Sequence, residues 1–209
     1  MNNLTIVSLC DFTGNWSRPY ELAGYQVIRV DLQHGQDIRL LPFIAEPIHG
    51  ILAAPPCTHF SRAGAHLWCE KGDAALIEGM AVVDACLRAV AIYRPAWWAL
   101  ENPIGRLKDY LGPAKWKFDP YDFGDPWTKR TWLWGNFTPP VPIISAQARL
   151  AVSPTWSAPG SLSSKHLDRA VRTKPSARLD RTTWLGSRRQ IERSATPEGF
   201  AQAFFEANP

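Results

Sequence analysis

The sequence lacks the features that mark a disulfide scaffold, a zinc knuckle or a membrane protein. It has four cysteines in 209 residues and no close C-x-x-C pair, which argues against a zinc knuckle and favours reduced thiols. Its longest apolar runs, such as HGILAAPP, are too short to cross a bilayer. The stretch MNNLTIVSLCDF has no basic segment followed by an apolar stretch and a small-residue cleavage site. We therefore expect a cytoplasmic protein that does not enter a membrane.

The charge of the chain is small in total but unevenly distributed. The net charge is +4, and residues 147–193 hold ten Lys and Arg against three Asp and Glu, which gives +7 there and −3 elsewhere. A basic segment on a near-neutral body indicates a polyanion as partner, although a solvated basic face gives the same pattern. With 45% apolar residues, the chain is long enough to bury one full core.

Short apolar runs alternate with helical patterns along the first half of the chain. The apolar runs cover 4–9, 26–32, 49–56 and 96–103, and the helical patterns cover 17–25 and 72–94. This alternation predicts parallel strand–helix–strand units, and hence an α/β fold with a doubly wound, mostly parallel sheet. In such sheets the ligand binds outside the carboxyl ends of the strands.

The composition changes at about residue 138. The stretches TPPVPIISAQ and SAPGSLSSKH are rich in Pro, Gly and Ser, and a basic stretch follows them. We therefore expect a core over 1–137, a small irregular basic segment over 138–190, and a helix within 191–209 that packs back on the core.

The stretch AAPPCTHFS places Cys57 directly after two prolines. Because proline fixes φ and removes a backbone donor, Pro56 holds this corner rigid, and the small polar Ser61 leaves room for a polar substrate. A thiolate here could act as a nucleophile. The alternative is that Cys57 is a buried structural cysteine beside a turn. Cys69, which we expect in a loop, and Cys86, which we expect in the core, lack this setting.

A carboxyl group ends the apolar run AWWALENP. Burial beside hydrophobic walls raises the pKa of a carboxyl group, so Glu101 could donate a proton or a hydrogen bond to a ring nitrogen. A loop-anchoring acid is the alternative. Together, Cys57 and Glu101 suit covalent activation of a heteroaromatic base, in which sulfur adds to the ring while the acid neutralises a ring nitrogen.

The loop DFTGNWS follows the first apolar run and carries one glycine among small polar residues. A nucleotide-like cofactor meets a doubly wound sheet at this position, although the loop is not a GxGxxG motif. Asp31, at the end of the second run, is placed to accept hydrogen bonds from ribose hydroxyls. Asp37 could cap a short helix or bind an adenine amino group.

The ordered set DFTGNWS, Asp31, QDI, APPCTHFS, LENPIGRL and FGDPWTKRTWLWGN resembles the DNA cytosine-5 methyltransferases, in the short form common in phages and prophages. The resemblance covers about residues 4–136, and RSATPEGFAQAFFEAN is similar to the closing motifs of the family. It implies a Rossmann-like class I methyltransferase fold, S-adenosyl-L-methionine as cofactor, and DNA as substrate. Duplex DNA would require the target base to leave the stack. A phage-encoded chain would act in the cytoplasm of its host.

The resemblance also implies a role for each candidate residue. Cys57 would add to cytosine C6, Glu101 would engage N3, and Asn102 would orient Glu101 or the Cys57 loop. The cofactor would bind Phe12, Gly14, Trp16, Asp31 and Asp37, and the substrate would also contact Pro56, Ser61, Asn102, Lys129 and Arg130. Lys129 and Thr131 fall on the two arginines of the family's Gln-x-Arg-x-Arg motif.

The segment 138–190 is much shorter than the target-recognition domains of the family. Its basic residues fit contact with a nucleic-acid backbone, and Trp156 or Trp184 could stack on a base. Sequence readout could be minimal, supplied by a protein partner, or replaced by recognition of single strands. Two alternatives stay open. One is the same covalent chemistry with another carbon donor or on a nucleotide, and the other is a non-catalytic nucleic-acid-binding or partner protein on the same fold.

Overall fold

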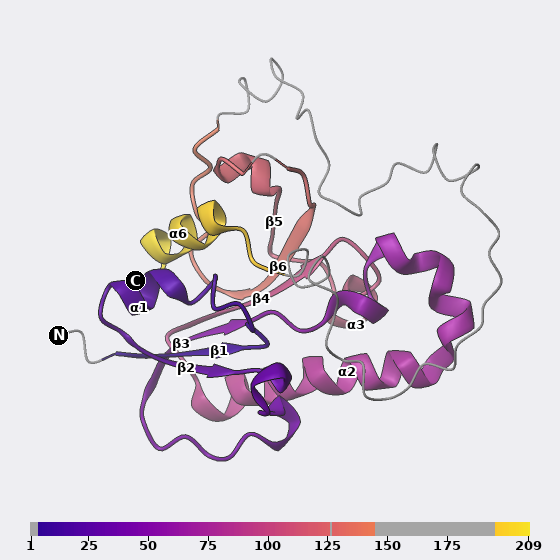
Figure 1. Ribbon diagram of the computed structural model, residues 1–209, viewed down its shortest axis with the longest axis horizontal. Coiled ribbons are helices and arrows are strands. Elements are labelled where there is room, and N and C mark those ends of the chain that lie inside the picture. The colour runs from indigo at the N-terminus through magenta and orange to yellow at the C-terminus, as the bar shows by residue number, and fades with distance from the viewer. Residues whose placement is uncertain (1–3, 126, 145–194) are drawn as a thin grey trace.

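The computed structural model describes residues 4–125, 127–144 and 195–209 (Figure 1). Most of the predicted basic segment, with Trp156 and Trp184, therefore lies outside the described residues. The strands are β1 (Thr5–Leu9), β2 (Gln26–Val30), β3 (Ile48–Ala53), β4 (Trp97–Pro103), β5 (Trp116–Phe118) and β6 (Thr131–Asn136). The α-helices are α1 (Arg18–Leu22), α2 (Trp68–Tyr93), α3 (Lys108–Leu111) and α6 (Glu198–Ala207).

The six strands form one sheet in the order β2-β1-β3-β4-β6-β5. The pairs β1–β2, β1–β3 and β3–β4 are parallel, whereas β6 runs antiparallel to both β4 and β5. The first four strands are the four apolar runs of the sequence. The fold is therefore α/β with a Rossmann-like, mostly parallel sheet, as the alternating pattern predicts.

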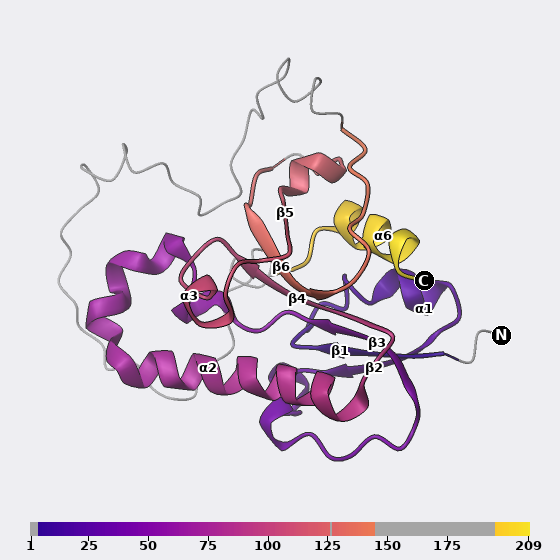
Figure 2. The same ribbon diagram turned by 180° about the vertical axis from the view of Figure 1, so that it is seen from behind.

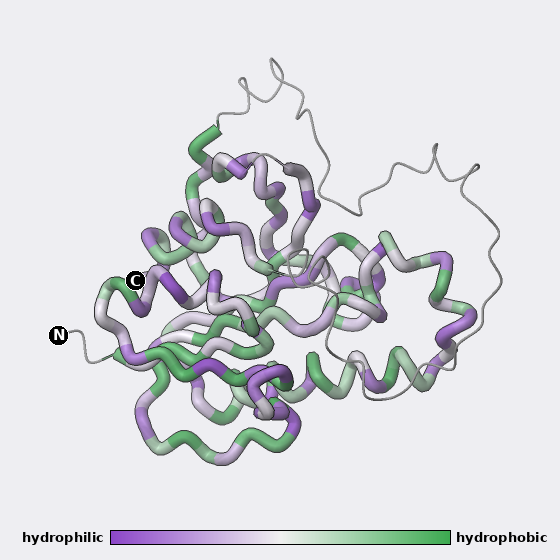
Figure 3. The backbone as a smooth tube through the Cα atoms, in the orientation of Figure 1, coloured by the Kyte–Doolittle hydropathy of each residue, from purple (hydrophilic) through white to green (hydrophobic). Residues whose placement is uncertain are grey.

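Helices cover both faces of this sheet (Figures 1 and 2). On one face α2 packs through Val83, Cys86 and Ala89 against side chains of β1, β3 and β4. On the other face the aromatic side chains of α1 and α6 meet the opposite sides of the same strands. Figure 3 shows hydrophobic stretches along the central strands and alternating hydropathy along α2, as a sheet buried between helices requires.

Two helices begin where their sequences predict. Ser17 precedes α1 and Pro19 lies in its first turn, where a missing N–H costs nothing. The α6 helix packs back on the core, with Phe200 and Phe204 fully buried. In the described ranges, no helix is both long and apolar enough to span a membrane.

The long helix differs from its prediction at its start. It begins at Trp68 and is interrupted at Gly72, whose φ of +66° is non-helical and favours glycine. Cys69 therefore lies in a helical turn, and its prediction as a loop residue was wrong. Glycine looks like a helix boundary in sequence, but here it joins two helical segments. Cys86 is fully buried in the core, as predicted.

Candidate active site

The strand order reverses between β1 and β3. The chain passes from β1 outward to β2, but from β3 outward to β4 on the other side. The loops that follow β1 and β3 therefore diverge, and a crevice outside the carboxyl ends of these two strands is where open α/β sheets bind their ligands. The candidate residues come from the ends of the strands around this point.

Cys57 and Glu101 lie at the carboxyl ends of two paired strands. The β3–β4 register pairs Ala53 with Leu100, so the residues that follow Ala53 run beside Glu101 and Asn102. Pro56, which is exposed, precedes a single 3-10 turn, Cys57–His59. The buried Asn102 amide donates a hydrogen bond of 2.9 Å to the carbonyl of Pro55. Of the two orientations predicted for Asn102, the structure shows the bond to the Cys57 loop.

Three further contacts hold the loops after β3 and β4 together. Arg62 N donates to Ile104 O, and Arg106 N donates to Phe60 O, each at 2.9 Å. The Arg106 guanidinium also donates through Nε to His59 O at 2.8 Å. A Cβ on Gly105 would lie 1.9 Å from Phe60 O, so only glycine permits this approach. The Cys57 loop and the Glu101 loop are thus held against each other.

Glu101 is buried beside a lysine. Its side chain is 7% exposed, and Lys129 Nζ lies 3.8 Å from Glu101 Oε1. This oxygen has no hydrogen-bond partner among the described residues. Burial raises the pKa of Glu101, and the nearby Lys129 ammonium opposes that rise.

Lys129 reaches this edge because β6 is antiparallel to β4. The register pairs Pro103 with Thr131, so the residues before β6 lie beside the end of β4. Two bonds fix the backbone of Lys129: its N–H donates to Asp119 Oδ1 at 2.9 Å, and its carbonyl accepts from Thr131 Oγ1 at 2.7 Å. The neighbouring Arg130 is exposed, and its carbonyl accepts from Ile104 N.

Cys57 is a half-buried residue that lies among charged groups. Burial is the largest influence and raises the pKa of its thiol, Lys129 lowers it, Glu101 raises it, and Lys71 lowers it. Lys71 belongs to the first turn of α2 and donates to Thr58 O at 3.1 Å. Ser61 uses its hydroxyl to accept from Ala63 N, which caps the next 3-10 helix.

The loop after β1 is organised by a buried carboxylate. Asp11 Oδ2 accepts hydrogen bonds from the hydroxyls of Ser8 and Ser17 and from the backbone N–H of Ser17. Phe12 is half-buried, and its ring lies 5.1 Å from that of His34 in the loop after β2. The two loops therefore meet, with Phe12 between them and next to the sheet edge.

Asp31 and Asp37 follow β2 and both cap short helices. Asp31 accepts from Gln33 N at 2.8 Å, and burial raises its pKa. Asp37 accepts from Arg39 N and pairs with the Arg39 guanidinium, which lowers the pKa of Asp37. For Asp37 the structure shows the helix-capping alternative, and both its oxygens are engaged by Arg39.

Two of the predicted cofactor residues, Gly14 and Trp16, are packed against other side chains of the chain. A Cβ on Gly14 would lie 2.0 Å from Arg29 Nη1, so the space beside this glycine holds the Arg29 side chain. Trp16 is 0% exposed and packs against Phe200 and Phe204, with ring centroids 5.9 and 5.5 Å away. The prediction that Trp16 lines the cofactor pocket is therefore wrong, because its ring belongs to the aromatic core beneath the loop.

Sequence reasoning did not assign functions to Arg106 and Lys71. Arg106 stacks over the Trp68 ring, with its guanidinium carbon 4.5 Å from the ring centroid, while its Nε holds the Cys57 loop. Arg106 stands in the quoted stretch LENPIGRL, four residues after Asn102, and a charged residue so close to a strand end was the available signal. The sequence carries no such signal for Lys71, because it looks like an ordinary surface residue of a helix.

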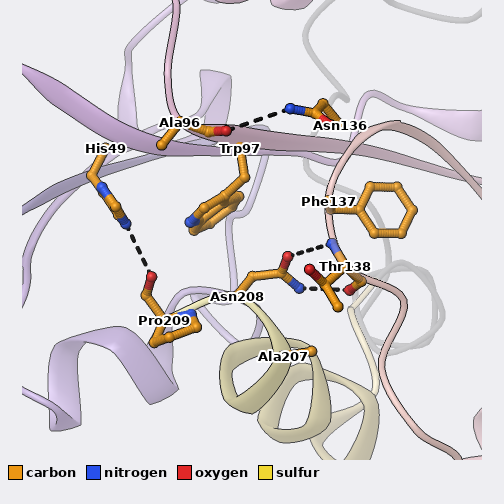
Figure 4. Close-up of a pocket in the computed structure, with 9 residues that line it drawn as sticks. All are labelled: His49, Ala96, Trp97, Asn136, Phe137, Thr138, Ala207, Asn208 and Pro209. Atoms are coloured by element: carbon orange, nitrogen blue, oxygen red, sulfur yellow. Dashed lines mark hydrogen bonds between the residues drawn. The ribbon is translucent and has the colours of Figure 1, made fainter.

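A cavity of about 340 Å³ lies at the opposite edge of the sheet (Figure 4). It borders the amino ends of β3 and β4, where His49 and Trp97 face Asn208 and Pro209. Asn208 bridges this region by bonding to both the N–H and the carbonyl of Thr138. Cys57 and Glu101 lie at the other end of the same strands, so the cavity is separate from the candidate site.

Comparison with solved structures yields similarities of low sequence identity. No protein-family model matches the chain, and no curated protein matches it. A crystal structure of a proposed DNA modification methyltransferase encoded within a prophage (E. coli) aligns with 19% identity and a TM-score of 0.45. The alignment covers 64% of this chain and 47% of that one, so this chain matches about half of that protein's length.

Proposed function

We propose that this chain transfers a methyl group from S-adenosyl-L-methionine to C5 of cytosine in DNA, through a covalent adduct between Cys57 and C6 of the base. One observation carries the proposal. A half-buried cysteine and a buried glutamate lie at the carboxyl ends of two paired parallel strands, and hydrogen bonds from Asn102, Arg62 and Arg106 fix the two loops against each other. A purely structural cysteine and glutamate need no such common frame.

The chemistry follows from the properties of the two groups. The Cys57 sulfur would add to C6, and the electron pair of the C5–C6 double bond would move toward C5. Protonated Glu101 would bond to N3 and neutralise the negative charge that the addition spreads into the ring. The electron pair at C5 would form the bond to the methyl group, while the bond from that carbon to the sulfonium sulfur of the cofactor would break and leave its electrons on that sulfur. Water would then accept the C5 proton, the C5–C6 double bond would form again, and the Cys57 sulfur would leave as a thiolate. The Cys57 side chain is thus regenerated.

The residues after β1 and β2 fit the cofactor in part. S-adenosyl-L-methionine would supply an electrophilic methyl group at the crevice between the β1 and β3 loops. The Phe12 ring offers an apolar surface there, and the Asp31 carboxylate is the kind of acceptor that binds ribose hydroxyls. The Arg29 side chain fills the space beside Gly14, and Arg39 engages the carboxylate of Asp37. Trp16 is fully buried in the core. We therefore keep Phe12 and Asp31 as the proposed cofactor residues.

The substrate would approach the same edge of the sheet. Lys129 and the exposed Arg130 lie there, beside the exposed Pro56 at the Cys57 corner. Because C6 lies on the ring and is shielded in a stacked duplex, the target base must be extruded or already single-stranded. The basic residues of 147–193 would contribute contacts to the phosphate backbone.

The test combines labelled S-adenosyl-L-methionine with cytosine-rich DNA, both duplex and single-stranded, and with DNA that carries 5-fluorocytosine. We expect label in the DNA and a denaturation-resistant protein–DNA adduct with the fluorinated substrate. Cys57→Ser should abolish both, whereas Cys69→Ser, which removes an exposed thiol of α2, should keep both.

Other results would assign the chain differently. Label on a free cytosine nucleotide but never on DNA would make the nucleotide the substrate. Cofactor binding without label transfer or adduct on any DNA or nucleotide would refute the catalytic proposal, and a non-catalytic binding protein would be the conclusion.

A further inference from the structure

The candidate site contains two acidic groups and a lysine ammonium close to one of them. Cys57 and Glu101 can each carry a negative charge, and Lys129 Nζ lies 3.8 Å from Glu101 Oε1. In the resemblance Lys129 stands at an arginine position that contacts the base. The structure shows its ammonium beside the Glu101 carboxyl group of this chain.

We propose that Lys129 is the shared counter-ion of Cys57 and Glu101, so that the site carries one negative charge at a time, on the carboxyl group or on the thiol. In the resting form Glu101 is the carboxylate and Cys57 the thiol. In the reactive form one proton has moved from the thiol to the carboxyl group, and the net charge of the site is unchanged. The inference rests on the proposed function in taking Cys57 as the nucleophile.

Burial is the first argument for a single charge. The side chains of Glu101 and Lys129 are 7% and 19% exposed, so water screens their charges poorly. Two neighbouring acids in such surroundings do not ionise independently, because the charge of one opposes the charge of the other. One ammonium compensates one of them, and among the described residues a second negative charge would have no cation of equal burial beside it.

The charged groups around the two acids give the second argument. Glu101 from β4, Lys129 from the segment before β6, and Lys71 from α2 are the groups that act on Cys57 in the described part of the chain. Lys71 is bound to Thr58 O on the outer side of the loop and acts on Cys57 less than Lys129 does. Only Lys129 acts on both acids.

The rigidity of the lysine backbone is the third argument. Its N–H and carbonyl are bonded to Asp119 and Thr131, so only the flexible side chain can follow the charge from Glu101 to Cys57. A lysine suits this role better than an arginine, because its ammonium is a compact charge on a flexible stem without a preferred planar pairing geometry. Glu101 Oε1, which has no hydrogen-bond partner in the described structure, can take up the proton.

The test measures thiol reactivity without DNA or cofactor, so it can fail independently of the methyl-transfer assay. Iodoacetamide alkylation of the full-length protein is followed between pH 6 and 9, and the Cys57 peptide is quantified by mass spectrometry. The exposed Cys69 serves as a reference thiol in the same sample. Because the thiolate is the reacting species, the rate reports its population.

The shared counter-ion predicts opposite effects for the two partners. Lys129→Met should slow Cys57 alkylation at pH 7 by about tenfold relative to Cys69 and move its pH profile upward. Glu101→Gln should speed it by a few-fold and move the profile downward, because the competing charge is gone. Lys129→Arg should keep the rate within about threefold of the unmodified protein, since the charge remains.

Each alternative outcome decides against the proposal. If the Cys57 alkylation rate of Lys129→Met stays within twofold of that of the unmodified protein, Lys129 does not control the ionisation of the thiol. Slower alkylation in Glu101→Gln would show that the carboxyl group assists the thiol instead of competing with it. If Lys129→Met fails to fold, Lys71→Met and Glu101→Gln still decide, because Lys71→Met must move the profile less than Glu101→Gln does.

Discussion

The sharpest structural prediction concerns Gly105, where the loop after β4 crosses the Cys57 loop. An alanine Cβ at this position would lie 1.9 Å from Phe60 O and 3.0 Å from Ser61 Cα, so the two backbones must separate by about 1 Å. Overpacking of a well-filled site costs about 1–3 kcal/mol. The hydrogen bonds from Arg62 N to Ile104 O and from Arg106 N to Phe60 O would also weaken, at about 1 kcal/mol each.

Gly105→Ala should therefore lower the free energy of unfolding by about 2–4 kcal/mol, which in a chain of this size lowers Tm by roughly 5–15 °C. Urea denaturation measures the change, and Cys57 alkylation reports whether the corner has moved. Gly64→Ala is the matched control, because its added Cβ would meet only Thr58 O at 3.9 Å. A Gly105→Ala protein within about 0.5 kcal/mol of the unmodified one would refute the idea that this close approach holds the loops together.

Substitutions at three further residues probe other parts of the fold by chemical denaturation. Burial and the nearby Glu198 raise the pKa of Asp125 from 3.8 to about 6, so its ionisation reduces stability as the pH rises from about 4 to about 6. Asp125→Asn should therefore add about 1 kcal/mol above pH 6, after allowance for its partial exposure, and nothing below pH 4; a pH-independent effect would contradict this. Trp16→Ala should cost about 3–5 kcal/mol and Trp16→Phe distinctly less, since the buried indole N–H has no partner in the described residues. Asn208→Ala should cost about 2–4 kcal/mol, because its amide bonds to Thr138 N, Thr138 O and Phe204 O, yet Cys57 alkylation at the opposite edge should not change.

The sequence predicts the parallel half of the sheet because its strands are short runs of mostly apolar residues. Strands β1, β3 and β4 are largely buried on both faces, so they read as mostly hydrophobic stretches, and a Pro, Asp or Asn at or soon after the end of each breaks the pattern. Because parallel strands share a carboxyl edge, the order of Cys57 and Glu101 in the chain was enough to bring them to neighbouring positions. The roles of these two residues stay predictions.

The antiparallel part of the sheet was not predicted as strands. Strand β5 has three residues, and β6 includes Gly135 at a φ of +144°, whose missing side chain lets it approach Trp98 O. Neither segment has a clear period of two. Trp16 was misassigned for a related reason: its loop position suggested contact with a ligand, while the aromatic residues that enclose it lie about 190 positions later, in α6. Contacts at such separation leave no trace in the local pattern.

The direction of β6 determines the chemistry of the candidate site. A parallel strand in its place would begin at the amino edge of the sheet, and the residue before it would lie far from Glu101. Because β6 is antiparallel, Thr131 pairs with Pro103, and Lys129 is delivered to the edge where β3 and β4 end. Among the described residues, a wholly parallel sheet would have left Lys71 as the remaining cation that acts on Cys57. Under the proposed shared counter-ion, the antiparallel strand would supply the charge that lets either acid ionise, at the place where the proposed reaction needs a cation.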